Sequence, residues 1–300
     1  MISTSPDIIF PNIGIEIKRL NEVAFTFFGI EVYWYGILIA SGILGGYAMA
    51  CFLAKRTKQD TEIYTEFLMW AIIGAITGAR AYYVFNSWDS YKDNIFEIFK
   101  LRDGGLGFYG GLISACITLI IFTKVKKLNF WILADTAAPG VFVGQIFGRI
   151  GNFTNKEAFG GYSDNILCMA IKKTEAKYVP DVLKDKIVEF YGTEYIQVHP
   201  MFLYEILWNS VMLILLLFYF KKRKFNGEIL ALYFLMYGMG RAWMETMRTD
   251  QLLIGHTNIP ISVVVSLLLV IVSVTFIIIK RIQANRNNIP KPNDLLKTEK

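Results

Sequence analysis

Histidine and cysteine are scarce in this chain: its 300 residues include two histidines and three cysteines. Protein metal sites and disulfides need such residues in close groups. His199 and His256 lie far from each other and from the cysteines, so the sequence shows no metal-ligand spacing. Cys51 and Cys116 fall inside apolar runs, and Cys168 stands alone in a polar segment. We therefore expect no metal, no cofactor and no intramolecular disulfide.

A signal peptide and an internal repeat are also missing from the sequence. Near Met1 no basic segment precedes a continuous apolar core, so we expect no cleavable signal peptide. Without a repeat there is no sign of the inverted halves found in many transporters. Residues 1–31 instead contain the alternating stretch IGIEIKRL, which predicts an N-terminal arm with strand character.

Apolar residues, in contrast, are abundant. Hydrophobic residues make up 54% of the chain and aromatic residues 15%, which is too apolar for an ordinary soluble domain. A helix of about 20 residues crosses about 30 Å of hydrocarbon. We therefore predict an all-α polytopic membrane protein with about seven transmembrane helices and a small extracytoplasmic subdomain. The spans are expected near 32–54, 66–88, 106–123, 129–148, 200–220, 228–246 and 261–279.

Basic residues gather after alternate spans, at 55–58, 124–127, 221–224 and 280–286. With seven spans all four clusters lie on one side, which the positive-inside rule makes the cytoplasm. The N-terminus is then outside and the C-terminus inside. The net charge of +6 is therefore mainly a topology signal, and no nucleic-acid partner is expected.

The expected organisation has three parts. Residues 1–31 form an extracytoplasmic N-terminal arm, and residues 280–300 form a cytoplasmic basic tail. Between them, residues 32–279 form a seven-helix transmembrane domain with an outer insertion at 162–198.

Polar residues that a bilayer resists gather at the outer ends of the spans. A rise of 1.5 Å per residue and alternating span directions place ten of them in that leaflet: Tyr35, Arg80, Tyr109, Arg149, Asn152, His199, Glu205, Arg241, Glu245 and Arg248. Arg241, Glu245 and Arg248 share a helix face at i, i+4 and i+7. Arg149 and Asn152 share another at i and i+3. Such faces point into a bundle or a wet cavity, because lipid opposes them.

Two interpretations of these arginines are open at this point. In the first, the arginines snorkel to lipid phosphates and pair with Glu205 and Glu245 to hold helices together. In the second, they bind an anionic ligand, since guanidinium groups match phosphate oxygens in a bidentate way. Several arginines converge with the glycine-rich segments Gly104–Gly111 and Gly148–Gly161, which favours the second interpretation.

The segment Gly148–Gly161, GRIGNFTNKEAFGG, resembles the signature block of the prolipoprotein diacylglyceryl transferase family of bacterial membrane enzymes. Six further segments resemble that family in the same order. They are VYWYG around Tyr35, GARAYYV around Arg80, GGLGFYGGLI around Tyr109, LADTAAPG from Leu133, HPMFLYE from His199 and GRAWMETMR from Gly240. The resemblance covers residues 30 to 280.

The resemblance implies an enzyme of the bacterial cytoplasmic membrane. Such an enzyme transfers the diacylglyceryl group of phosphatidylglycerol to the lipobox cysteine of a prolipoprotein, which forms a thioether and releases glycerol phosphate. The expected partners are therefore phosphatidylglycerol, prolipoprotein lipobox peptides and membrane lipid. Residues 32–279 would then be the catalytic domain.

The family's site residues carry over to matching positions. We expect catalytic roles for Arg149, Arg241, Tyr109 and Tyr35. Substrate-binding roles are expected for Arg149, Asn152, Glu157, Gly160, Arg80, Glu205, Glu245 and Arg248. In this hypothesis Arg149 and Arg241 clamp the phosphate, and Asn152 orients the headgroup. Glu157 fixes the signature loop or binds glycerol hydroxyls, while Glu245 and Arg248 hold Arg241.

The general base is open. Some members of the family carry histidine where this chain has Tyr109. An unperturbed tyrosine is a poor base for a thiol, because the two groups titrate near about 10 and about 8.5. Either neighbouring arginines activate Tyr109, or the acceptor thiol ionises in the cationic field itself, which we favour.

Two rival functions are also open. A transporter or channel for an anionic solute would use intramembrane arginines. It predicts charged residues at several depths, whereas here they crowd at one face and only Asp135 lies near the other. A different lipid-headgroup transferase would share the arginines but would give no reason for the signature segment.

Overall fold

The computed structural model describes two compact units, one built from two segments of the chain and the other from a single segment. The first unit comprises Met1–Gly46 and Ala138–Lys300, and the second comprises Tyr47–Ala137. The histidine at 256 and most of the predicted tail lie outside the described residues. The described residues are 5–100, 104–249, 251–255, 257, 259–287 and 292.

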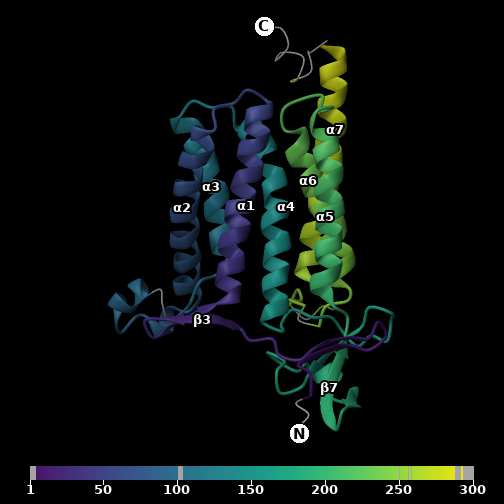
Figure 1. Ribbon diagram of the computed structural model, residues 1–300. Coiled ribbons are helices and arrows are strands. Elements are labelled where there is room, and N and C mark those ends of the chain that lie inside the picture. Colours follow the sequence, from purple (N-terminus) through teal and green to yellow (C-terminus); the bar gives the residue numbers. More distant parts are fainter. Residues whose placement is uncertain are drawn as a thin grey trace. The chain divides into compact units, whose positions relative to one another are not determined.

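The described chain contains seven helices of 18 residues or more (Figure 1). They are α1 (Trp34–Arg56), α2 (Glu62–Asn86), α3 (Phe108–Val125), α4 (Phe130–Thr154), α5 (Met201–Phe220), α6 (Glu228–Glu245) and α7 (Ile261–Arg286). Six of the seven, all except α6, are long and apolar enough to cross a membrane. The predicted polytopic helical fold is therefore confirmed.

Helix α6 contains three charged residues among its 18, namely Glu228, Arg241 and Glu245. Glu228 is fully buried and accepts hydrogen bonds from Arg281 of α7 and from Tyr219 of α5. Because a buried charge is tolerated only when it is paired, these contacts tie α6 to both neighbouring helices.

The N-terminal arm and the outer insertion form one antiparallel sheet, a pairing that sequence reasoning did not predict. Its strands are β1 (Ile8–Phe10), β2 (Ile15–Ile17), β5 (Met169–Lys172), β6 (Ile187–Phe190) and β7 (Thr193–Val198), in the order β2-β1-β5-β7-β6. Ile8 lies opposite Ile171 across the β1–β5 pair. The predicted small subdomain is therefore a sheet to which both segments contribute.

Two β-hairpins have loops with the same backbone conformation. The strands β3 (Val23–Phe27) and β4 (Ile30–Tyr33) form a separate two-stranded sheet. The residue pair Phe28-Gly29 joins them, and Tyr191-Gly192 joins β6 to β7; all four residues have positive φ. Two-residue hairpin loops favour this conformation because its twist matches that of the strands.

The buried face of the five-stranded sheet packs on the signature segment. Ile8, Ile171, Ile196 and Val198 form one apolar cluster with Phe159, which follows α4 in the chain. In this unit the sheet lies where α4 ends and α5 begins (Figure 1). The sheet thus adjoins the segment that carries the signature.

The second unit packs α2 against α3 at close range. A Cβ on Gly110 would lie 2.4 Å from the Gly78 carbonyl oxygen, so the helices require glycine there. Short 3₁₀ helices η1 (Trp88–Ser90) and η2 (Ile95–Phe99) occupy the connection between α2 and α3.

Candidate active site

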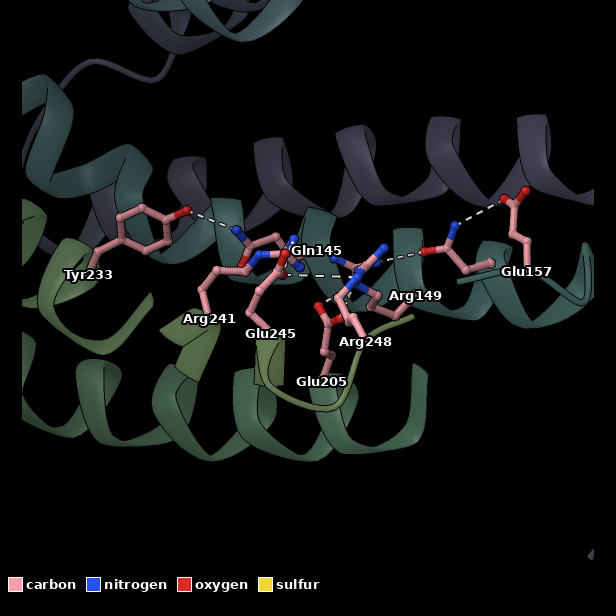
Figure 2. A network of polar contacts seen from close by, with 9 residues as sticks. Gln145, Arg149, Glu157, Glu205, Tyr233, Arg241, Glu245 and Arg248 are labelled. Carbon is pink, nitrogen blue, oxygen red and sulfur yellow. Dashed lines mark hydrogen bonds and ion pairs between the residues drawn. The ribbon is translucent and has the colours of Figure 1, made fainter. Parts of the chain in front are cut away.

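Arg149, in the last turns of α4, contacts both α5 and the signature segment (Figure 2). Its Nε lies 2.5 Å from Oε2 of Glu205, and its Nη1 donates to Oδ1 of Asn152 at 2.9 Å. Glu205 lies one turn into α5. Arg149 and Asn152 thus share a helix face at i and i+3, as predicted, because α4 continues through Thr154.

The end of α6 brings two further arginines to the same network (Figure 2). Arg241 Nη2 lies 2.7 Å from Glu245 Oε2, at the predicted i, i+4 spacing. Arg248 follows the helix and lies between the two carboxylates. Its Nη1 is 3.8 Å from Glu205 Oε1, and its Nε is 4.0 Å from Glu245 Oε2.

Side-chain exposure divides this arginine cluster, defined as Arg149, Arg241, Arg248, Glu205 and Glu245, into two groups. The side chains of Arg149 and Arg241 remain 25% and 20% exposed. Arg248, Glu205 and Glu245 are only 11%, 9% and 3% exposed. Arg149 and Arg241 therefore keep the most exposed surface, while Glu205 and Glu245 are buried and Arg248 is mostly covered.

The signature loop continues the network away from the arginines. Asn152 Nδ2 donates to Glu157 Oε1 at 3.1 Å, and Asn155 Nδ2 donates to the same oxygen at 3.2 Å. Asn152 accordingly accepts from Arg149 with one end of its amide and donates to Glu157 with the other. The side chains of Arg149, Asn152 and Glu157 are thus linked in series by hydrogen bonds.

Two other predicted residues border the same unit. A Cβ on Gly151 would lie 2.9 Å from Tyr35 Cδ2, so the Tyr35 ring packs directly on the signature helix. A Cβ on Gly160 would lie 2.7 Å from the Met247 carbonyl oxygen. Gly160 pairs with Arg248 in an isolated β-bridge. The contacts of Gly160 therefore join the signature loop to the end of α6.

His199 closes this junction through its backbone. Its N–H donates to the Gly161 carbonyl, and its own carbonyl accepts from the Gly160 N–H, both at 3.0 Å. Burial lowers the pKa of the His199 imidazole below its ordinary value of 6.5, against a smaller opposing effect of Asp164. Burial therefore favours the neutral form of the ring.

Arg80 belongs to the second unit and is buried by the connection that precedes α3. An arginine has five N–H donors, and here each has a carbonyl acceptor 2.7–3.2 Å away: Glu97, Ile98, Lys100, Gly104 and Gly105. A Cβ on Gly105 would lie 2.4 Å from Arg80 Nη1. In this arrangement the Arg80 guanidinium holds the backbone of the connection between α2 and α3, and it has no N–H donor left for a substrate.

Tyr109 also belongs to the second unit, in the first turn of α3. Its side chain is exposed, and Gly110 beside it packs on α2. The structure therefore brings Tyr35, Arg149, Asn152, Glu157, Gly160, Glu205, Arg241, Glu245 and Arg248 into one unit, with Arg80 and Tyr109 in the other.

Sequence reasoning missed the polar pair Gln145–Tyr233. Gln145 Nε2 donates to the Tyr233 hydroxyl at 2.9 Å, linking α4 to α6 one turn before Arg149 (Figure 2). The signal was available, because Gln145 and Arg149 are four residues apart and so share a helix face.

A family model matches most of the chain, including the segments that form this site. The model described as prolipoprotein diacylglyceryl transferase matches residues 22–279. The chain belongs to the prolipoprotein diacylglyceryl transferase family. The predicted resemblance is thereby confirmed, and the match includes every helix that contributes to the arginine cluster.

Curated members of the prolipoprotein diacylglyceryl transferase family resemble the chain over nearly its whole length. A phosphatidylglycerol–prolipoprotein diacylglyceryl transferase of Listeria welshimeri is 39% identical over 272 residues, which covers 91% of this chain and 94% of the relative. Proteins of the same name from Finegoldia magna and Bacillus cytotoxicus are 40% and 38% identical, covering 85% and 88% of this chain and 94% of each relative. Together with its apolar helices, membership of this family makes the chain a multi-pass membrane protein.

Proposed function

We propose that this protein transfers the diacylglyceryl group of phosphatidylglycerol to the cysteine thiol of a prolipoprotein lipobox. The thiolate sulfur attacks the glycerol carbon that bears the phosphate. A carbon–sulfur bond forms as the carbon–oxygen bond breaks, and glycerol phosphate leaves with the bonding electrons. The names of the relatives and the family match support this assignment.

The observation that carries the proposal is the pair of partly exposed guanidinium groups in the arginine cluster. Arg149 and Arg241 are each held by a buried carboxylate, and their side chains remain 25% and 20% exposed. A phosphodiester with a single negative charge can bind to these exposed guanidinium groups. As the carbon–oxygen bond breaks, negative charge grows on the leaving phosphate, and cations already in place stabilise that charge.

The exposure of the side chains suggests their separate tasks. Arg149 and Arg241, which keep open surface, contact the phosphate. Glu205 and Glu245 hold those two guanidinium groups from behind, each through an ion pair of 2.5–2.7 Å. Arg248 lies between the carboxylates and limits their mutual repulsion. We assign Glu205, Glu245 and Arg248 as positioning residues rather than direct ligands.

The signature loop places hydrogen-bonding groups next to the phosphate position. Asn152 is held by Arg149 and by Glu157. The carboxylate of Glu157 accepts hydrogen bonds, so it is suited to the hydroxyls of the glycerol headgroup. We propose that Asn152 and Glu157 recognise that headgroup, and that Tyr35 covers the loop from α1.

The thiol proton has two possible destinations. A few per cent of a free cysteine is thiolate at neutral pH, and a cationic surrounding raises that fraction. We propose that the acceptor ionises in this way and that its proton passes to solvent. The alternative base is Tyr109, which lies exposed in the first turn of α3.

The topology belongs to the same proposal. The clusters of lysine and arginine lie at the C-terminal ends of α1, α3, α5 and α7. The arginine cluster lies at the C-terminal ends of α4 and α6 and at the N-terminal end of α5. With the basic ends in the cytoplasm, the site opens at the outer leaflet, the C-terminus is inside and the N-terminus outside. A translocated prolipoprotein presents its cysteine on that side.

Expression in bacteria depleted of their own diacylglyceryl transferase tests the function. Mass spectrometry of a reporter lipoprotein is expected to show a diacylglyceryl group on its cysteine, and Arg241→Ala is expected to abolish the signal. Met239→Ala, which truncates an exposed side chain on the same helix, serves as the matched control. An unmodified cysteine, despite confirmed membrane expression of the wild-type chain, would contradict the proposal.

A further inference from the structure

A buried lysine lies in the signature loop, between the two residues assigned to the headgroup. We propose that the ion pair of Lys156 with Glu175 is a positioning element through which the outer sheet holds Asn152 and Glu157 for the donor lipid. This inference rests on the proposed transferase function and adds a residue pair that acts on donor binding without touching the donor.

Lys156 is buried, and its ammonium group is paired inside the protein. Its side chain is only 4% exposed, and its Nζ lies 2.6 Å from Glu175 Oε2 and 4.0 Å from Asp7 Oδ2. Glu175 follows β5, and Asp7 directly precedes β1. Both segments of the sheet subdomain, the arm and the insertion, therefore contribute a carboxylate to this one ammonium group.

The backbone of the loop needs such an anchor. Lys156 and Ala158 have φ angles of 51° and 55°, in the left-handed region that disfavours residues with a Cβ. Conformations of this kind persist only when the surroundings impose them. The Lys177 N–H adds a further contact, donating to the Lys156 carbonyl at 3.4 Å.

Neighbouring residues of the loop contact different parts of the protein, the arginine cluster on one side and the sheet subdomain on the other. Asn152 accepts from Arg149 and donates to Glu157. Lys156 instead donates to Glu175, which follows β5, and Phe159 packs on the sheet. The Phe159 ring stacks on Tyr178 with centroids 4.9 Å apart. A cavity of only ≈ 10 Å³ remains between the loop and the sheet. Glu157 is adjacent to Lys156 in the chain, so any movement of the anchored lysine displaces the Glu157 carboxylate.

The test compares variants of the pair in steady-state assays with phosphatidylglycerol vesicles and a synthetic lipobox peptide. Lys156→Met and Glu175→Gln are each expected to raise KM for phosphatidylglycerol about tenfold, and the double variant no more than either single one, because coupled partners are not additive. KM for the peptide is expected to stay unchanged. Lys156→Arg, which keeps the charge, is expected to recover most of the lost affinity.

A second ion pair on the same sheet provides the control. Lys173 Nζ lies 2.7 Å from Glu194 Oε2, but both side chains are well exposed, at 39% and 60%. Lys173→Met is expected to leave both KM values unchanged.

The outcomes separate this inference from the function on which it rests. An inactive wild-type enzyme would sink the transferase assignment itself. An active wild-type enzyme, with KM for phosphatidylglycerol unaltered in folded Glu175→Gln, would overturn the role of the ion pair. Equal increases in KM for lipid and peptide would also overturn it, since they indicate general loss of structure. Glu175→Gln keeps the inference testable if Lys156→Met does not fold, because Glu175 lies at the surface end of the pair.

Discussion

The two units of this protein bury arginine in different ways. In the first unit, Arg149, Arg241 and Arg248 form ion pairs with carboxylates, and two of the three keep exposed surface. In the second, Arg80 is surrounded by five backbone carbonyls and has no carboxylate partner among its described contacts. Both solutions satisfy a buried guanidinium, but only the first leaves hydrogen-bonding capacity for a ligand.

The difference teaches how to separate ligand-binding cations from structural ones. An arginine whose five donors all meet carbonyls is a clamp on the backbone, and its loss is felt as disorder of the loop. An arginine that is held by a carboxylate but remains partly exposed is oriented and can still bind an anion. The predictions below test this distinction.

The largest effect is expected at Arg149 and Arg241. Removing either guanidinium takes away a cation that meets the developing phosphate charge, which costs about 10²- to 10³-fold in turnover. Transfer assays with Arg149→Ala and Arg241→Ala measure this loss. Near-normal turnover in both variants would end the distinction between the two kinds of arginine.

Glu245→Gln is expected to have the next largest effect. The substitution removes the charged partner 2.7 Å from Arg241 and one of the carboxylates that face Arg248. Breaking a buried ion pair costs about 3–5 kcal/mol, so both thermal stability in detergent and turnover should fall. Unchanged turnover with reduced stability would show that Glu245 does not orient Arg241.

Arg80→Gln is expected to act through stability. Hydrogen bonds to a charged group contribute about 1.5–3 kcal/mol each, and several are lost together. Activity should fall in parallel with thermal stability and recover on cooling, whereas activity of Arg241→Ala should not recover. A reduced affinity for phosphatidylglycerol with normal stability would instead make Arg80 a direct ligand.

Tyr109→Phe tests the base and is expected to change little. If the acceptor thiol ionises without a protein base, the variant keeps most of its turnover at neutral pH. Rates measured between pH 6 and 9 would reveal a lost basic limb if Tyr109 accepts the proton.

The smallest expected effect on stability is the acid dependence that the ion pair of Glu175 contributes. The hydrogen bond from Lys156 lowers the pKa of Glu175 below its ordinary value of 4.5, Lys172 acts in the same direction, and partial burial opposes both. A lowered folded pKa means that the stabilisation is present above the ordinary pKa and disappears as the pH falls through the folded value. Thermal unfolding between pH 7 and 3 should therefore show a small acid-dependent loss that Glu175→Gln lacks. Asp7, which also faces Lys156 at 4.0 Å, is present in both proteins.

Much of the fold followed from local patterns. Each of the seven expected spans is a helix, since apolar runs of membrane length specify helices without knowledge of their neighbours. The spacing of Arg241 and Glu245 predicted their pairing for the same reason. The sheet was not predicted as a whole, because Ile8 pairs with Ile171 across more than half of the chain. Nothing local to either segment specifies that register.

The candidate site, like the fold, was only partly predictable from local sequence patterns. Sequence alone determined the helices, the family and the residue types at the site, because hydropathy, helical period and the signature segment are written in neighbouring positions. Only the tertiary structure decided which arginine faces a carboxylate and which faces carbonyls, and it alone showed that Lys156 is buried against Glu175. Those outcomes depend on contacts between segments that are distant in the chain, where the balance between desolvation and pairing is set by geometry.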